Sequence, residues 1–245
     1  MSTLSTFKLP FTEAINFFKK KTAIPIEEYN DLEQSAYYQS FVVAGANSQD
    51  IVIDFYEAVT KAIELGYSKQ WFEEQFDEIV KKYGWSYNGN AGWRADVIMD
   101  TNVNSAYNTG KYMQDTEPIL LEAYPYWQYK TMGDLLVRPE HAKWNNYITK
   151  YDNPIWKTIY PPNGYSCRCK VKTLDKKRYD KIDDKYKTFP EIEYYKQENR
   201  KTGETETRIK GIDRGFETSP ATDWGHSQAK NLNAEHKSYV QLELF

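Results

Sequence analysis

Both cysteines of this 245-residue chain stand one residue apart, at Cys167 and Cys169, and the histidine nearest to them along the chain is His141. Thiolate sulfur and imidazole nitrogen are ligands that zinc favours, so these three residues could hold a zinc ion, with Asp152, His226 or water as a fourth ligand. The Cys-x-Cys spacing is a weaker zinc signal than Cys-x-x-Cys. Free cysteines are also often buried as small apolar residues, so a structural corner of the core is the competing interpretation.

Other chemistry finds less support in the sequence. A disulfide between Cys167 and Cys169 would close a strained ring and is not expected. A nucleophilic pair of Cys167 and His141 has no local signature beside it. The chain has no phosphate-binding glycine-rich loop, no Gly-x-Ser-x-Gly and no His-Glu-x-x-His. These motifs therefore give no support to a particular enzymatic reaction.

The stretch that carries the thiols alternates in character and predicts a strand over residues 167–174. One face would carry Cys167, Cys169, Val171 and Thr173, and the other Arg168, Lys170 and Lys172. The two thiols then point the same way. The basic face could contact DNA phosphates without reading bases, although a basic run is more often a solvated surface.

Helices are expected to dominate the first half of the chain. A short helix should follow Thr12, and the cap pairs Ser48/Gly66 and Ser68/Gly84 bound two amphipathic helices joined as an αα-hairpin. A third, longer helix is expected from about Trp93 to Met113. It contains an unusual polar set, which could be a contact face or could tie the helix to neighbouring loops; the second interpretation is favoured. These residues are Asp100, Thr101, Asn102, Asn104 and Asn108.

From Pro125 onward the pattern changes to short strands. Residues 126–131 alternate, residues 143–149 are expected to form two strands around Asn145-Asn146, and a hairpin is expected around Thr202-Gly203. The fold class is α+β: a helical region over residues 1–115 (αα-hairpin plus long helix), then a small, mainly antiparallel β-containing domain over residues 116–215. Residues 216–245 are expected to form an extended or partly disordered tail.

Composition narrows the class of protein further. The formal net charge is −3, so the chain is no polycation built for nucleic acid, while aromatic residues make up 16% and could supply contact area. The beginning of the sequence shows no secretory signal pattern, and no run reaches the apolar length of a membrane span. Two cysteines without an export signal fit a reducing cytoplasm.

The block "RPEHAKW…YDNPIWKTIYPPNGYSCRCKVKTL" resembles the signature of the phage Mu F-like minor head proteins, the phage head morphogenesis family. The matching positions are Arg138, His141, Trp144, Trp156, Pro161, Pro162, Asn163, Gly164, Cys167, Arg168 and Cys169. The similarity extends from about Phe17 to Trp224 and includes "KGIDRGFETSPATDW". Two departures are Asn145-Asn146, where the family commonly has Asp-Gly, and an unusually apolar "MGDLLV" before Arg138.

The resemblance implies a minor capsid protein that binds near the portal and assists head assembly and DNA packaging or delivery. It places the head morphogenesis domain at residues 116–215. Its implied partners are the portal or major capsid protein and, non-specifically, phage DNA, with no membrane and no small-molecule substrate. The implied location is the virion, or the bacterial cytoplasm during assembly. The runner-up is a nuclease- or toxin-like enzyme in which His141 and Arg138 act as acid-base and phosphate-holding groups.

Overall fold

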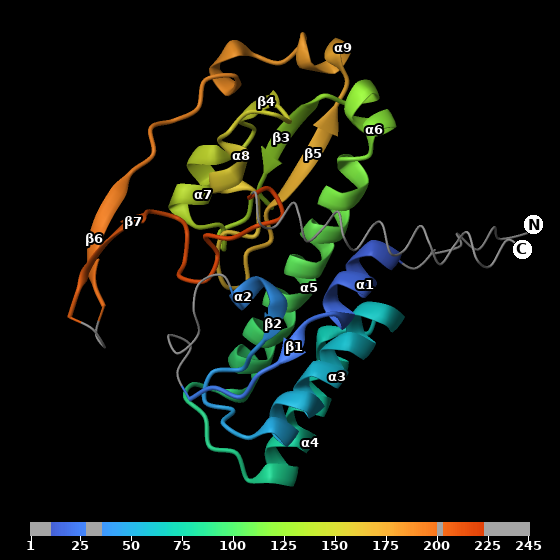
Figure 1. The fold of residues 1–245 in the computed structure, drawn as a ribbon, viewed down its shortest axis with the longest axis vertical. Coiled ribbons are helices and arrows are strands. Elements are labelled where there is room, and N and C mark those ends of the chain that lie inside the picture. Colours follow the sequence, from blue (N-terminus) through green and yellow to red (C-terminus); the bar gives the residue numbers. More distant parts are fainter. Residues whose placement is uncertain (1–10, 28–35, 200–202, 223–245) are drawn as a thin grey trace, which may run out of the picture.

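The computed structural model describes residues 11–27, 36–199 and 203–222, and confirms the α+β class (Figure 1). Helices α1 (Thr12–Lys19), α3 (Gln49–Leu65), α4 (Lys69–Tyr83) and α5 (Ala91–Asp115) form the first half. With them lie α2 (Ala36–Gln39) and a two-stranded parallel sheet of β1 (Thr22–Ala23) and β2 (Ser40–Phe41). None of the helices in the described part of the chain combines the length and apolar character that a membrane span requires.

The αα-hairpin of α3 and α4 is confirmed together with its caps. The hydroxyls of Ser48 and Ser68 accept hydrogen bonds from the backbone of Ile51 and Trp71, which satisfies amides that the first turn leaves unpaired. Gly66 and Gly84 close the helices in the left-handed conformation. The hairpin therefore forms because Gly66, which ends α3, is followed two residues later by Ser68, which begins α4.

Helix α5 connects the two halves of the molecule. At 25 residues it is about 37 Å long, from a rise of about 1.5 Å per residue. Its first turns bury Ala95, Ile98 and Met99 in the core of the helical half, and its last turns place Tyr112 and Met113 in the core of the second half. Figure 1 shows α5 running from the helical half up beside the sheet.

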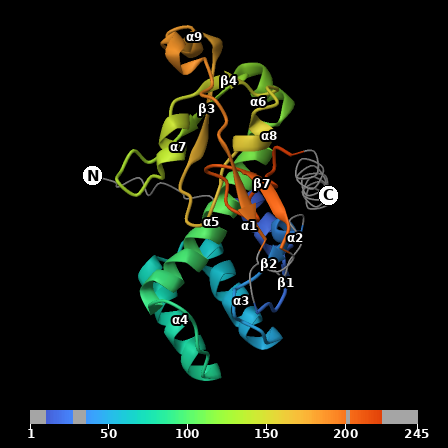
Figure 2. The same ribbon diagram turned by 90° about the vertical axis from the view of Figure 1, so that its left-hand side faces the viewer.

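The second half is built on a three-stranded antiparallel sheet in the order β4-β3-β5. The strands are β3 (Tyr126–Lys130), β4 (Ile148–Lys150) and β5 (Lys170–Leu174), with helices α6 (Pro118–Ala123), α7 (Pro139–Trp144) and α8 (Trp156–Ile159). Beyond β5 come α9 (Lys176–Tyr179) and a 3-10 turn over Asp184–Tyr186. A separate hairpin of β6 (Tyr194–Glu198) and β7 (Thr205–Ile209) extends to the left in Figure 1 and therefore faces the viewer in Figure 2.

Two expectations about strands are corrected. Residues 143–149 are not two strands: Lys143 and Trp144 end α7, and only the second arm is a strand. Pro139 begins α7 at its first turn, where a missing amide costs nothing, and the helix carries the chain up to Asn145. Strand β5 begins at Lys170, so the cysteines lie in the irregular segment before it. The expected β6–β7 hairpin is confirmed, although Thr202 in its turn lies outside the described residues.

Candidate metal centre

His141 is held inside the second half by α7. A helix places positions three apart on one face, so His141 and Trp144 both turn inward, and both are buried. Their rings are stacked, with centroids 5.4 Å apart and planes 21° apart. The rings of Tyr129 and Trp144 are perpendicular, with centroids 5.8 Å apart. The imidazole is thereby fixed in position and in the orientation of its ring plane.

The two cysteines are positioned by a buried turn. Asn163, fully buried, donates from its side-chain amide to the carbonyl of Ile159 at 2.9 Å and to the Tyr129 hydroxyl at 3.1 Å. The chain then reverses, and the amide of Cys167 donates to the carbonyl of Gly164 at 3.1 Å. This turn delivers both thiols to the same side, as the alternating pattern predicted.

Two of the five polar residues of α5 hold this segment from behind, as the favoured interpretation expects. The side-chain amide of Asn108, buried in the helix, donates to the carbonyl of Cys169 at 3.2 Å. The hydroxyl of Thr101 accepts a hydrogen bond from the amide of Ser166 at 3.1 Å. Buried backbone groups need such partners, so these polar positions in the helix satisfy the irregular loop that carries the thiols.

The three side chains meet as a cluster, and the sequence had brought the same three together. His141 Nδ1 lies 3.7 Å from Cys167 Sγ and 3.6 Å from Cys169 Sγ, and their ligand atoms all lie within 4.8 Å of one another. His141 Nε2 lies 2.7 Å from the carbonyl oxygen of Gly211 and donates to it. Both cysteines are free thiols, as expected, and all three residues are buried.

The electrostatics of the cluster favour a thiolate. The hydrogen bond with Cys169 and the neighbouring His141, acting against burial, hold the pKa of Cys167 well below its usual range. The hydrogen bond with Cys167, together with burial, raises the pKa of Cys169. Burial alone would lower the pKa of His141, but its contact with Cys167 outweighs that effect and the pKa is raised. The groups thus form one interacting unit.

A second polar contact lies next to the cluster. Arg138 Nη2 forms an ion pair with Asp213 Oδ2 at 2.8 Å and donates to the carbonyl of Tyr165 at 3.1 Å. Asp213 Oδ2 also accepts from the amide of Tyr165 at 3.0 Å, and the amide of Asp213 donates to the carbonyl of Asn163 at 2.9 Å. The pair therefore joins the start of α7, the cysteine turn and the segment that follows β7.

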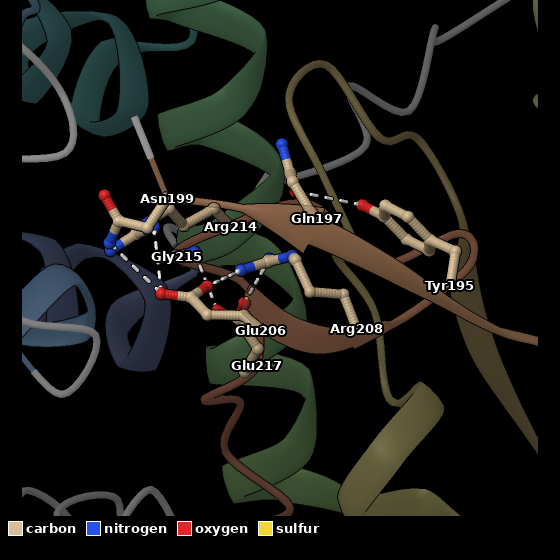
Figure 3. Close-up of polar contacts among 8 residues, drawn as sticks. All are labelled: Tyr195, Gln197, Asn199, Glu206, Arg208, Arg214, Gly215 and Glu217. Carbon is tan, nitrogen blue, oxygen red and sulfur yellow. Dashed lines mark hydrogen bonds and ion pairs between the residues drawn. The ribbon is translucent and has the colours of Figure 1, made fainter. Parts of the chain in front are cut away.

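That last segment is in turn fixed by the β6–β7 hairpin. Figure 3 shows Arg208 of β7 pointing between two carboxylates, Glu206 and Glu217. The carboxylate of Glu217 accepts a hydrogen bond from the backbone amide of Gly215 at 2.7 Å. The carboxylate of Glu206 accepts one from the side-chain amide of Asn199 at 3.2 Å. Because Arg208 is almost wholly buried, its two partners are needed to offset the loss of hydration. The hairpin thereby anchors residues 211–217, which contribute Gly211 and Asp213.

The remaining predicted site residues lie apart from the cluster. Arg168 makes two hydrogen bonds of 2.8 Å to the carboxylate of Asp134. Lys170 lies over the ring of Tyr107, 4.3 Å from its centroid, and Lys172 is exposed on the outer face of β5. Asp152, considered as a fourth ligand, is exposed, and His226 lies outside the described residues.

Of the other motif positions, Trp156 is buried and donates from its indole to the carbonyl of Lys150 at 2.9 Å, and Pro161, Pro162 and Gly164 are buried in the turn. Sequence reasoning assigned no role to Gly211 or Asp213. They fall in the "KGIDRGF" stretch, whose spacing of small and acidic residues was the available signal.

The sequence of this chain is similar to that of a family of phage proteins. Residues 54–172, which run from within α3 through α4 and α5 to the cysteine segment and into β5, match the family model described as phage Mu protein F like protein. The chain is 31% identical over 189 residues to a protein of Escherichia phage Mu that is named, provisionally, capsid assembly protein F. That alignment covers 71% of this chain and 43% of the relative.

A second relative is the Mu-like prophage FluMu F protein of Haemophilus influenzae, 32% identical over 156 residues, or 60% of this chain and 37% of the relative. The chain thus spans less than half the length of either relative. No solved structure matches it. These matches identify the chain as a member of the Mu F-like family of phage proteins.

Proposed function

We propose that this chain acts in capsid assembly of a tailed phage or prophage, as a minor head protein that binds near the portal. The observation that carries the proposal is the similarity to capsid assembly protein F of phage Mu, which runs through both halves of the described fold. The expected partners are the portal protein, the major capsid protein or both. The protein would be found in the virion and, during assembly, in the host cytoplasm.

Exposed apolar side chains on both halves of the molecule support a role in protein contact. The loop before α7 presents Leu136, 80% exposed, and Leu135, fully exposed, with Met132 half exposed beside them. On the helical half, Trp93 is 55% exposed and Tyr67 is 41% exposed. Exposed aromatic and aliphatic side chains of this size are typical of contact surfaces. The apolar loop is also where the sequence departs from the common family pattern, so it is suited to a partner specific to this phage.

The proposal is tested in the phage or prophage that encodes the chain. Deletion of its gene should leave heads that are absent, misshapen or poor in DNA, and wild-type protein supplied from a plasmid should restore them. Electron microscopy of lysates and the amount of DNase-protected DNA measure this. Normal, DNA-filled, infectious particles in the deletion strain would contradict the proposal. Co-purification with the portal or major capsid protein from infected cells tests the partner separately.

DNA contact during packaging forms a finer part of the proposal. Lys170 and Lys172 point to the outer face of β5, opposite the buried Val171, where they could meet phosphates without reading bases. Arg168, in contrast, is already neutralised by Asp134. The contact would therefore be weak and dependent on salt concentration.

We infer a structural role rather than catalysis for His141 and Arg138. His141 is buried and both of its ring nitrogens face protein atoms, while Arg138 is paired with Asp213. A general acid-base group has to reach its substrate within hydrogen-bonding distance. Incubation of the purified chain with DNA and RNA, with and without divalent metal, should give no cleavage. Cleavage that is lost in His141→Ala would support the enzyme instead.

A further inference from the structure

We propose that Cys167, Cys169 and His141 bind one zinc ion, through both sulfurs and the Nδ1 nitrogen, and that this ion locks the second half of the fold. The inference concerns the purified chain alone and does not depend on the proposed role in capsid assembly. It rests on the distances within the cluster, on the contacts behind the ligands and on the segments that they join.

The distances fit a tetrahedral zinc site. With Zn–S of about 2.3 Å and Zn–N of about 2.05 Å, a tetrahedral ion separates sulfur from nitrogen by about 3.6 Å. His141 Nδ1 lies 3.7 Å and 3.6 Å from the two sulfurs. The sulfur atoms also lie within 4.8 Å of one another, a range that includes the separation of about 3.8 Å expected between two thiolates on one ion.

A metal ion would join the three ligand atoms of this cluster directly. Because His141 Nε2 carries the proton that it donates to Gly211, the Nδ1 nitrogen of the neutral ring has one lone pair. Two sulfurs face that single lone pair at nearly equal distances. A metal ion placed between the three atoms would bind that lone pair and both sulfurs at once.

The surroundings of the ligands are those of a metal site. A metal-bound histidine usually donates its second ring nitrogen to a carbonyl or carboxylate, which sets the tautomer and the ring orientation. Gly211 supplies that carbonyl at 2.7 Å, and Trp144 stacks on the ring. On the sulfur side, Asn108 and Thr101 hold the backbone of the cysteine segment from α5. The ligands are therefore oriented before an ion arrives.

A fourth ligand completes such a site, and Asn163 in the same turn as the cysteines carries a buried oxygen that is unpaired within the described part of the chain. Asn163 Oδ1 is buried without a hydrogen-bond partner among the described residues, while the nitrogen of the same amide donates to Tyr129. A buried carbonyl oxygen left unpaired is costly. A water bound to the ion would fill the fourth position, and it could donate a hydrogen bond to a neighbouring acceptor.

The ion would join parts of the chain that also meet in the hydrophobic core of the second half. His141 belongs to α7, the cysteines lie in the irregular segment before β5, and Gly211 follows the β6–β7 hairpin. Short helices and irregular loops have little stability of their own, so a metal that binds only the folded state stabilises them together.

The test begins with full-length protein purified without chelator from zinc-supplemented cells. Elemental analysis should find about one zinc per chain, and Cys167→Ser/Cys169→Ser should lose it. Protein loaded with Co²⁺ should show thiolate-to-cobalt charge-transfer absorption and the intense visible bands of a tetrahedral site. Chelator should lower the Tm of the wild type by roughly 5–10 °C and leave the Tm of the double variant unchanged.

The matched control is Trp144→Phe, which removes part of the ring stacked on His141 but no ligand atom. It should lower the Tm and keep the zinc. If the double serine variant fails to fold, three measurements on the wild type still decide whether zinc is bound: the metal content, the cobalt spectrum and the response of the Tm to chelator. Wild-type protein without zinc or a cobalt spectrum, or a double variant that keeps its zinc, would overturn the assignment.

Discussion

Gly164 lies directly against the guanidinium of Arg138: a Cβ added at residue 164 would stand 1.9 Å from Arg138 Nη1 and 2.3 Å from Asp213 Oδ2. The absence of a side chain at this point of the cysteine turn is what allows the ion pair of Arg138 and Asp213 to close over it. The glycine of the "PPNGY" stretch is thus explained by its contact with Arg138 and Asp213.

Gly164→Ala should therefore destabilise the protein. Arg138 ends in a flexible side chain, but its ion pair with Asp213 and its hydrogen bond to Tyr165 prevent it from moving aside freely. The expected loss is about 1–3 kcal/mol in the free energy of unfolding, measured in urea. Gly92→Ala is the control, because its added Cβ meets nothing closer than 3.8 Å and alanine favours the helix. Arg138→Ala should reduce the cost of Gly164→Ala; an unchanged cost would contradict this explanation.

Gly110→Ala should be more damaging than its place in a helix suggests. The added Cβ would stand 2.6 Å from the backbone nitrogen of Ala14 and 2.9 Å from its Cα, so α1 and α5 could no longer approach each other as closely. Backbone atoms cannot rotate away, and we expect a loss near the upper end of about 1–3 kcal/mol. Hydrogen exchange should show α1 losing protection first. Equal protection of α1 in wild type and variant would show that the crossing is not tight.

The sequence predicted the helical half well because its signals are local. Ser48, Gly66, Ser68 and Gly84 each act within one helical turn, so the hairpin could be read without knowledge of the rest of the chain. The candidate site was predicted in part, because the three residues with zinc-binding side chains could be named from their types, although a turn and not the expected strand brings both thiols to one side.

What could not be predicted depends on contacts distant in sequence. Gly211 reaches His141 from 70 residues away, and Asp213 reaches Tyr165 from 48 residues away. The strand expected at Trp144 fails because burial of the indole beside His141 is achieved by a helix, and a pattern of apolar residues as short as this fits either element.

The ion pair of Asp134 and Arg168 gives a prediction for acidic pH. The Arg168 guanidinium holds the pKa of the Asp134 carboxyl below its usual range. A carboxyl group whose pKa is lower in the folded state adds stability above its unfolded pKa, and the contribution is lost as pH falls through the folded pKa. A carbon-detected NMR titration should therefore give the Asp134 carboxyl a lower pKa than an ordinary aspartate has. In Arg168→Ala the pKa should return upward; an unchanged value would show that Arg168 is not the cause.

The same pair should limit any binding of DNA by the outer face of β5. Asp134→Ala would free Arg168 beside Lys170 and Lys172, so affinity for random duplex DNA at low salt should rise. One added phosphate contact should steepen the plot of log K against log salt by about 0.9. Asp152→Ala, which removes an equal charge at another exposed position, is the control. If both variants gain equally, net charge and not Arg168 is responsible; if neither gains, the face does not bind DNA.

The apolar loop before α7 gives the most direct test of partner binding. Leu135 and Leu136 bury almost nothing within the chain, so Leu135→Ser/Leu136→Ser should leave the Tm within about 1–2 °C of wild type, because surface changes cost little. If the loop inserts into a pocket of the portal or capsid protein, co-purification should fall at least tenfold, as expected when about 1.4 kcal/mol of binding energy is lost. Leu65→Ser, at an exposed leucine at the C-terminal end of α3, is the matched control and should bind normally.

A second variant tests the loop in another way. Because the bidentate contact of Arg168 with Asp134 holds this loop, Asp134→Ala should weaken binding to the protein partner and strengthen binding to DNA. Opposite changes in partner binding and DNA binding would identify a docking loop, because a general loss of folding would weaken both kinds of binding.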